Sequence, residues 1–317
     1  MKDNPVLISI DTEGPTGSDP VKHMIYGEVS DGTRCGIDML MDVFDKYHVK
    51  GLFFVDMAEA WDYGQDKVLG VVSHIKDRGH DVGMHIHPDH MADKNRRYLW
   101  QYTLDEQKEI IGKCTELYQN TFHEHPLYFR AGRYGADNNT LDIISSIGYK
   151  YDFSEFYNHK GCHILPEITC NKVVRYKDIV EIPVSSYKSF NKFGYSRFDK
   201  LDISMPQREF IQVADLMRMD DSVDIISFFL HSFSLLKWRN QVDNPTLIDS
   251  ELKKLENILG YMKNKNYQFI SATALQTYAK AFDGSIVPTD YSRMKGSTAF
   301  FARRALEVIK MRMQNNV

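Results

Sequence analysis

The sequence predicts an α/β protein in which parallel strands and helices alternate around a (β/α) barrel. Strand-like apolar runs and amphipathic helices follow one another along most of the 317 residues. No low-complexity segment or short repeat interrupts that alternation. Strands that alternate with helices are typical of βα units around a parallel sheet. Seven or eight strands in one continuous alternation fit a single barrel better than two domains.

The first half of the chain begins with a strand and then repeats helix and strand. Its first run, VLISI, is continuously apolar, as expected of a strand buried in a parallel sheet. The next segment is an amphipathic helix, because Ile37, Leu40 and Phe44 recur at three- and four-residue spacing. In order, we expect a helix at 36–49, a strand at 50–56, a helix at 66–79, a strand at 80–86, a helix at 104–122, a strand at 125–131, a helix at 138–149 and a strand at 150–154.

The alternation lapses over about 156–206 and then resumes. That segment is rich in Gly, Pro, Tyr and Lys, which predicts a loop-rich insertion in the barrel. After it we expect a strand at 223–231, a helix at 247–265, a strand at 267–271 and a helix at 272–282. Residues 1–285 are therefore predicted to form one domain.

A basic amphipathic helix is expected in the remaining tail, residues 286–317. Its apolar side chains alternate with Arg303, Arg304, Lys310 and Arg312. Such a helix can lie on an anionic membrane surface, which would suit a lipid-linked substrate. The alternative, which we favour, is that it packs on the barrel or on a second subunit, and a homo-oligomer is compatible with the sequence.

The composition narrows the range of partners and compartments. The formal net charge of -4 and the pI near 6.3 argue against nucleic-acid binding, which needs a basic face. We find no signal peptide and no apolar run long enough to span a bilayer, so a cytoplasmic location is expected. The four cysteines form no CxxC pair, so reduced thiols are expected, although Cys162 and Cys170 lie close enough in sequence for a disulfide.

Residues capable of chemistry follow four of the predicted strands. In a parallel barrel, reactive side chains gather where strands end and loops begin. Any one of these residues alone would be weak evidence, but together they predict a site at one mouth of the barrel. They are Asp11 and Glu13 in DTEG, His85, His87 and His90 in HIHPDH, Arg130 in FRAGRYG, and His231 in FLHSF.

This set of residue types indicates metal-assisted hydrolysis. Two histidines and one carboxylate are a usual ligand set for catalytic zinc. Alternation along a strand puts Asp11 and Glu13 on one side, so that one can bind a metal while the other acts as a base. His85 and His87 likewise share a side, whereas His90 lies beyond Pro88 on a loop, so the second histidine ligand is either His87 or His90. No GxSxG, GxGxxG or Walker motif points to a covalent or nucleotide-dependent mechanism.

The order of these motifs, with the text DMLMDVFDKYHVKGLFFVD, resembles the NodB-homology polysaccharide deacetylases, carbohydrate esterase family four. The resemblance covers roughly residues 5–275 and represents a divergent DxE/HxHP branch. It implies a distorted (β/α) barrel of about seven strands. It also implies a divalent metal, most often Zn²⁺, and removal of N- or O-acetyl groups from a carbohydrate.

The resemblance also implies roles for single residues. Asp11 matches the catalytic base, and Arg130 matches the arginine that orients it. His231 matches the general acid, and Asp152 matches a carboxylate that tunes this histidine. In the loop after Arg130, Tyr134 and Arg133 are expected to contact the substrate.

The metal ligands depart from the usual family pattern. Thr12 stands where a metal-binding aspartate is usual, so the ligand role would move to Glu13. His85 matches the first histidine ligand, but Asp89 occupies the position of the second. His87 or His90 would replace it.

These expectations lead to a cytoplasmic, metal-dependent deacetylase. A soluble or lipid-linked sugar precursor in surface-polysaccharide biosynthesis is the expected substrate. The alternatives are a hydrolase of another C–N bond on the same barrel, and a barrel that binds carbohydrate without hydrolysing it.

Overall fold

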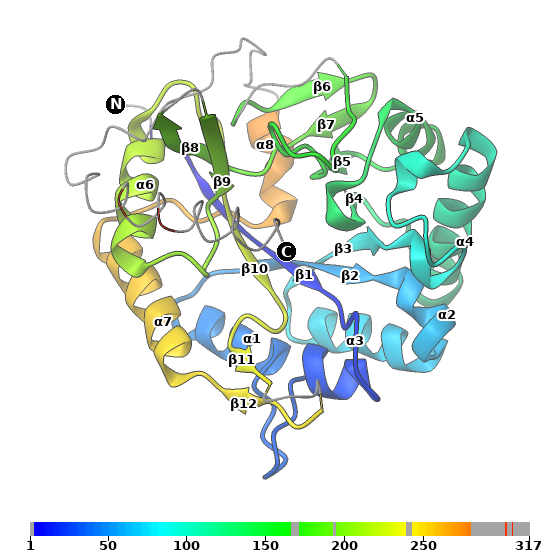
Figure 1. Ribbon diagram of the computed structural model, residues 1–317, viewed down its shortest axis with the longest axis horizontal. Coiled ribbons are helices and arrows are strands. Elements are labelled where there is room, and N and C mark those ends of the chain that lie inside the picture. The colour runs from blue at the N-terminus through cyan, green and yellow to red at the C-terminus, as the bar shows by residue number, and fades with distance from the viewer. Residues whose placement is uncertain are drawn as a thin grey trace.

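A curled sheet of eight strands forms the centre of the computed structural model (Figure 1). The structure describes residues 3–165, 171–192, 195–238 and 243–279, together with positions 302 and 306. In spatial order the sheet strands are β10 (Ile226–His231), β1 (Val6–Thr12), β2 (Gly51–Asp56), β3 (Asp81–Ile86), β4 (Tyr128–Ala131), β5 (Tyr151–Asp152), β7 (Ile179–Glu181) and β6 (Val174–Tyr176).

The seven strands from β10 to β7 are parallel to their neighbours, and only the edge strand β6 is antiparallel. The prediction of an α/β barrel with about seven parallel strands is therefore confirmed. The described α-helices are α1 (Ile37–Lys46), α2 (Ala60–Tyr63), α3 (Gln65–Asp77), α4 (Leu104–Phe122), α5 (Asn138–Ile147), α6 (Gln207–Met219), α7 (Asp249–Asn264) and α8 (Leu275–Ala279), and a π-helix covers Val21–Ile25. Helices α1 to α7 lie around the outside of the sheet (Figure 1).

Helix boundaries follow local capping chemistry where that chemistry is present. Helix α4 begins after Thr103, whose side chain accepts from the Glu106 backbone N–H, while the Glu106 carboxylate accepts from the Thr103 N–H. This reciprocal capping box satisfies two N–H groups that the helix leaves unpaired. Helix α5 begins after Asp137 in the same way and ends at Gly148, whose φ of 108° suits glycine. Helix α4 matches the predicted range of 104–122.

Alternate residues of each central strand face two different layers. Ile8, Ile10 and Phe53 pack into the core cluster that contains the buried faces of the helices. Leu7 and Phe54 point to the other side, which we call the inner face, in a second cluster that contains Leu275 of α8 but no residue of α1 to α7. Because strand side chains alternate, the odd-numbered positions at the end of β1 continue this inner face. On this face, the side chains at the strand ends are polar, whereas those farther back along the strands are mostly apolar.

The structure differs from the sequence prediction in three segments. The expected loop-rich insertion contains β6 and β7, together with a hairpin of β8 (Ser186–Lys192) and β9 (Tyr195–Lys200). The strand expected at 267–271 is reduced to a single bridge between Val6 and Phe269. Helix α6 was not predicted. The expected tail helix at 286–317 lies outside the described residues, apart from positions 302 and 306.

Two smaller expectations can be compared directly with the structure. Across the described ranges, no helix has both the length and the apolar character needed to cross a bilayer. Cys35, Cys114 and Cys162 are free thiols. Cys162 donates a hydrogen bond to Glu155 at 3.1 Å, whereas Cys170 lies outside the described residues.

Buried His80 makes the stability of the fold depend on pH. Its Nδ1 accepts a hydrogen bond from the Gly51 N–H at 3.2 Å, and its ring packs against Phe44 and Phe53. Burial lowers the pKa of His80 from 6.5 to about 4. As the pH falls, His80 is protonated in the unfolded chain before it is protonated in the folded protein. The contribution of His80 to the free energy of unfolding is therefore complete above pH 6.5 and is lost as the pH falls towards 4.

We expect His80→Asn to remove this pH dependence, because an amide oxygen can accept the Gly51 hydrogen bond without titrating. Between about pH 7.5 and pH 5, the free energy of unfolding of the wild type should fall by about 2 kcal/mol more than that of the variant. Urea unfolding at both pH values measures the difference. The exposed His48, changed to Asn, is the control and should behave like the wild type. An equal loss in His80→Asn would contradict the account.

Candidate active site

Strand register brings the predicted residues to one face and one end of the sheet. Asp11 on β1 pairs with His231 on β10, and His85 on β3 pairs with Arg130 on β4. Paired residues of neighbouring strands point to the same side of a sheet. All four side chains therefore belong to the inner face, at the carboxyl ends of the strands, where parallel barrels place their reactive groups.

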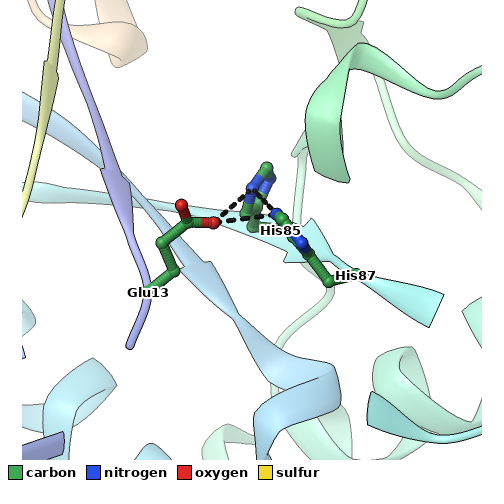
Figure 2. Close-up of side chains that lie close together, drawn as sticks. All are labelled: Glu13, His85 and His87. Atoms are coloured by element: carbon green, nitrogen blue, oxygen red, sulfur yellow. Dashed lines mark hydrogen bonds and ion pairs between the residues drawn. The ribbon is translucent and has the colours of Figure 1, made fainter. Parts of the chain in front are cut away.

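Glu13, His85 and His87 converge on one point (Figure 2). The Oε2 of Glu13 lies 2.8 Å from the Nε2 of His87 and 3.4 Å from the Nε2 of His85. The two Nε2 atoms are 3.1 Å apart. A carboxylate oxygen and two imidazole nitrogens facing one another are the donor set of a zinc site with an open position. These residues thus fit a divalent metal.

The hydrogen bond on the far side of His85 leaves its Nε2 free to bind a metal. Its Nδ1 donates to the backbone carbonyl of Arg130 at 2.8 Å, so the neutral ring carries its lone pair on Nε2. Burial disfavours the charged ring, yet the carboxylates of Asp11 and Glu13 raise the pKa of His85 to about 9. Burial also opposes ionisation of Glu13, but His87 and His85 hold the pKa of that carboxyl well below its ordinary value. The acid is therefore a carboxylate and a competent ligand.

A buried ion pair fixes Asp11 beside this group. Arg130 has no exposed surface, and its Nη1 donates to Asp11 Oδ1 at 2.5 Å. The rest of the guanidinium donates to Phe153 O at 3.2 Å and Ser9 Oγ at 3.0 Å. Burial raises the pKa of Asp11, but the Arg130 charge outweighs it together with those of His85 and His231, and the net shift is downward. Asp11 is thus held as a carboxylate, 4.0 Å from His85 Nε2 through its other oxygen.

His231 lies on the opposite side of Glu13. Its Nε2 is 3.8 Å from Glu13 Oε1, and its ring stacks on Phe233 at a centroid distance of 4.8 Å. The edge of Phe229 contacts the same ring. Burial lowers the pKa of His231, against the opposing charge of Glu13. The ring is partly exposed, so it can meet a substrate at the mouth of the barrel.

Asp152 is placed away from His231, unlike the arrangement that the resemblance implies. It pairs in register with Phe129, which belongs to the helix-covered core, so its carboxylate faces the opposite side of the sheet. There it accepts from Ser154 Oγ at 2.7 Å and interacts with Glu181. Asp152 therefore does not lie beside His231, where the expected tuning role would place it.

Asp202 is a functional candidate that the sequence interpretation missed. It forms a bridge with Phe229, two residues before His231, and its charge raises the pKa of the histidine against the effect of burial. Lys200 lies beside it, with Nζ 3.4 Å from Asp202 and 3.1 Å from the Tyr134 hydroxyl. Both residues fall in the segment that was expected to be loop-rich. No strand was predicted there, so the search for reactive residues at strand ends did not include them.

Arg133 and Tyr134 follow Arg130 in a tight turn, with φ values of 54° and 58°. The Arg133 guanidinium makes a two-point ion pair with Asp89, at 2.8 and 3.2 Å. This pairing engages the arginine that was expected to contact the substrate. Tyr134 is buried among Phe156, His159 and Phe229.

His90 does not join the Glu13 group. Its Nδ1 lies 2.7 Å from Asp62 Oδ2, and the second cluster of possible ligands that it enters contains Asp56 and Glu59. The structure thus groups His87, rather than His90, with Glu13 and His85.

Gly132 sets the position of His87, because a Cβ at residue 132 would lie 2.4 Å from His87 Cδ2. We expect Gly132→Ala to displace the ring and to weaken Zn²⁺ binding by roughly 10- to 100-fold. Competition with a chromophoric chelator measures the affinity. Gly70→Ala in α3 meets no atom within 4 Å and is the matched control, with unchanged affinity. Equal affinities in both variants would show that the close approach is unimportant.

Comparison with known proteins agrees with the motifs. The polysaccharide deacetylase family model matches residues 17–151, a stretch that contains His85, His87 and Arg130. No protein of curated function matches the sequence.

The fold has several relatives among solved structures. A Mycobacterium smegmatis protein provisionally named a polysaccharide deacetylase is 17% identical with a TM-score of 0.56, and the match covers 93% of this chain and 95% of that one. The peptidoglycan deacetylase PdaC from Bacillus subtilis is 11% identical with a TM-score of 0.44, over 88% and 93% of the two chains. BA3943, a CE4 family pseudoenzyme from Bacillus anthracis, is 12% identical with a TM-score of 0.46, over 90% and 67%.

Only the first of these scores exceeds 0.5, and at 17% identity it establishes the fold alone. The chain therefore matches the polysaccharide deacetylase family model over residues 17–151, which confirms the resemblance for the motifs within that stretch, and its fold is similar to that of the Mycobacterium smegmatis protein over most of its length.

Proposed function

We propose that this protein is a metal-dependent hydrolase that removes an acetyl group from a carbohydrate. The observation that carries the proposal is the position of Asp11. Arg130 holds it as a carboxylate next to the Glu13, His85 and His87 donors, with His231 across Glu13. A base, a metal-ligand set and an acid around one point are what hydrolysis of an amide or ester requires.

Glu13, His85 and His87 would hold the metal, and Zn²⁺ suits their one oxygen and two nitrogen donors. When bound, such a metal acidifies water and polarises the substrate carbonyl. The hydrogen bond from His85 to the Arg130 carbonyl orients the ring so that Nε2 faces Glu13 and His87, and a metal would bind there in place of the proton that the raised pKa of His85 keeps on the ring.

The side chains around the donors supply the proton transfers. Asp11 accepts a proton from the attacking water, and Arg130 keeps the carboxylate aimed while its guanidinium remains buried. His231 donates a proton to the nitrogen or oxygen that leaves the acyl carbon. One water is consumed, and acetate and the free amine or alcohol are the products.

A carbohydrate is the proposed substrate, because the family model describes polysaccharide deacetylases. The partly exposed Phe233 stacks on His231 and adds an apolar ring surface beside the acid. Aromatic faces of this kind suit the apolar face of a sugar ring. Within this class we propose a soluble or lipid-linked sugar precursor of a surface polysaccharide.

Acetate release from a panel of N- and O-acetylated saccharides tests the proposal. The zinc-loaded protein should release acetate, and chelation should abolish release until Zn²⁺ is restored. Asp11→Asn and His231→Asn should each lower kcat by roughly 100- to 10,000-fold, since each removes a proton transfer.

The exposed Asp77, changed to Asn, is the control and should retain full activity. Saccharide binding without any acetate release would identify a carbohydrate-binding barrel instead. Cleavage of a different C–N bond by the same residues would identify another hydrolase.

Asp202 is expected to act on catalysis through His231. Burial lowers the pKa of His231, and the Asp202 carboxylate opposes this together with the larger effects of Glu13 and Asp11, so it favours the protonated ring that a general acid needs. Asp202→Asn should lower kcat by roughly tenfold and leave KM within about twofold. Steady-state kinetics separates the two constants. Asp152→Asn is the informative comparison, because a larger kcat loss there without loss of stability would return the tuning role to Asp152.

A further inference from the structure

A second group of possible metal ligands lies beside the proposed catalytic site. Asp56 ends β2, Glu59 ends the turn Met57–Glu59, and His90 ends the turn Pro88–His90. Each of the three offers one ligand atom, and these atoms lie within 4.8 Å of one another. None of these residues belongs to the Glu13, His85 and His87 group.

Each carboxylate of this group uses one oxygen to bind the backbone of the catalytic site. Asp56 Oδ1 accepts from the N–H groups of Ala58 at 3.0 Å and His87 at 3.2 Å. Glu59 Oε1 accepts from the Gly14 N–H at 2.6 Å, next to Glu13 in the chain. The two acids therefore fix the backbone at two of the three proposed metal ligands.

The other oxygen of each acid has no hydrogen-bond partner. Asp56 is 1% exposed and Glu59 is 0% exposed, and Asp56 Oδ2 and Glu59 Oε2 are both buried without one. Burying an unpaired charged oxygen is costly, and buried charges are usually paired or coordinate a metal. Burial and the neighbouring Asp56 raise the pKa of Glu59 well above its ordinary value, and a bound cation would offset both effects.

His90 completes the group in the arrangement typical of a metal-binding histidine. Its Nδ1 lies 2.7 Å from Asp62 Oδ2 and donates to that carboxylate, which Lys94 also contacts. This leaves the lone pair on Nε2, 4.0 Å from Asp56 Oδ2. A carboxylate that orients the ring from behind is the usual support of a histidine ligand.

We propose that Asp56, Glu59 and His90 bind a second divalent cation. Two carboxylates and one imidazole form a mixed oxygen and nitrogen site, which suits Mn²⁺ or Zn²⁺. This cation neutralises the two buried acids and thereby holds Gly14 and the His87 backbone in place. It acts as a positioning element for the first site, with ligands of its own.

Metal content per chain tests this proposal in the full-length protein. After saturation with Mn²⁺ or Zn²⁺ and removal of free metal, elemental analysis should find two equivalents in the wild type. Glu59→Gln and His90→Asn should each retain one, and Asp77→Asn should retain two. Glu13→Gln should also retain one, held at the second group.

Thermal unfolding gives a second readout that does not depend on activity. Metal-free Glu59→Gln should be about as stable as metal-free wild type, because the amide oxygen can still accept the hydrogen bond from the Gly14 N–H. It should show a smaller rise in Tm on adding Mn²⁺. A lower Tm without metal and an unchanged rise would assign Glu59 a structural role and overturn the proposal.

The single-equivalent outcomes separate the two sites. One equivalent in the wild type that Glu13→Gln removes would overturn the second site and leave the proposed function standing. If the wild type binds one equivalent, and this metal is lost in His90→Asn but retained in Glu13→Gln, the result would support the second site and count against the first.

Discussion

The buried ion pair between Arg130 and Asp11 is the interaction on which the rest of the site depends. Arg130 lies on a central strand of the sheet, fully enclosed, with its guanidinium over the ring of Phe54 at 4.2 Å. Removing one partner of a buried pair leaves the other charge without compensation, which costs about 3–5 kcal/mol. The same residue uses its backbone carbonyl to orient His85. One residue thus positions both the proposed base and the first metal ligand.

Parallel register explains how residues far apart in the sequence form this site. The chain returns to the same sheet after each helix, so β1, β3, β4 and β10 end at one edge although Asp11 and His231 are 220 positions apart. Two-residue alternation then decides which side chains meet. Asp11, His85 and Arg130 share the inner face, and Asp152 does not. The composition of the candidate active site therefore depends on which strand positions point to the inner face as much as on the residue types.

Much of this arrangement could be predicted from sequence because it rests on local patterns. Alternating βα segments predicted the parallel sheet, and the spacing of two between His85 and His87 placed them on one side of a strand. Asp202 and the β8–β9 hairpin escaped prediction, since a polar, Lys- and Tyr-rich segment carries little periodicity. Glu59 escaped because it lies in a short turn, and only the fold brings it to Asp56. Asp152 shows the limit of motif matching, because a motif match does not tell to which face of the sheet the side chain points.

The central claim is that Glu13, His85 and His87 bind one catalytic metal, and anomalous diffraction from a zinc-soaked crystal tests it most directly. The account predicts a zinc peak within about 2.0–2.2 Å of Glu13 Oε2 and of the Nε2 atoms of His85 and His87, with Asp11 and His231 beside its open side. A crystal in which zinc occupies other residues and leaves these three atoms unligated would contradict the account.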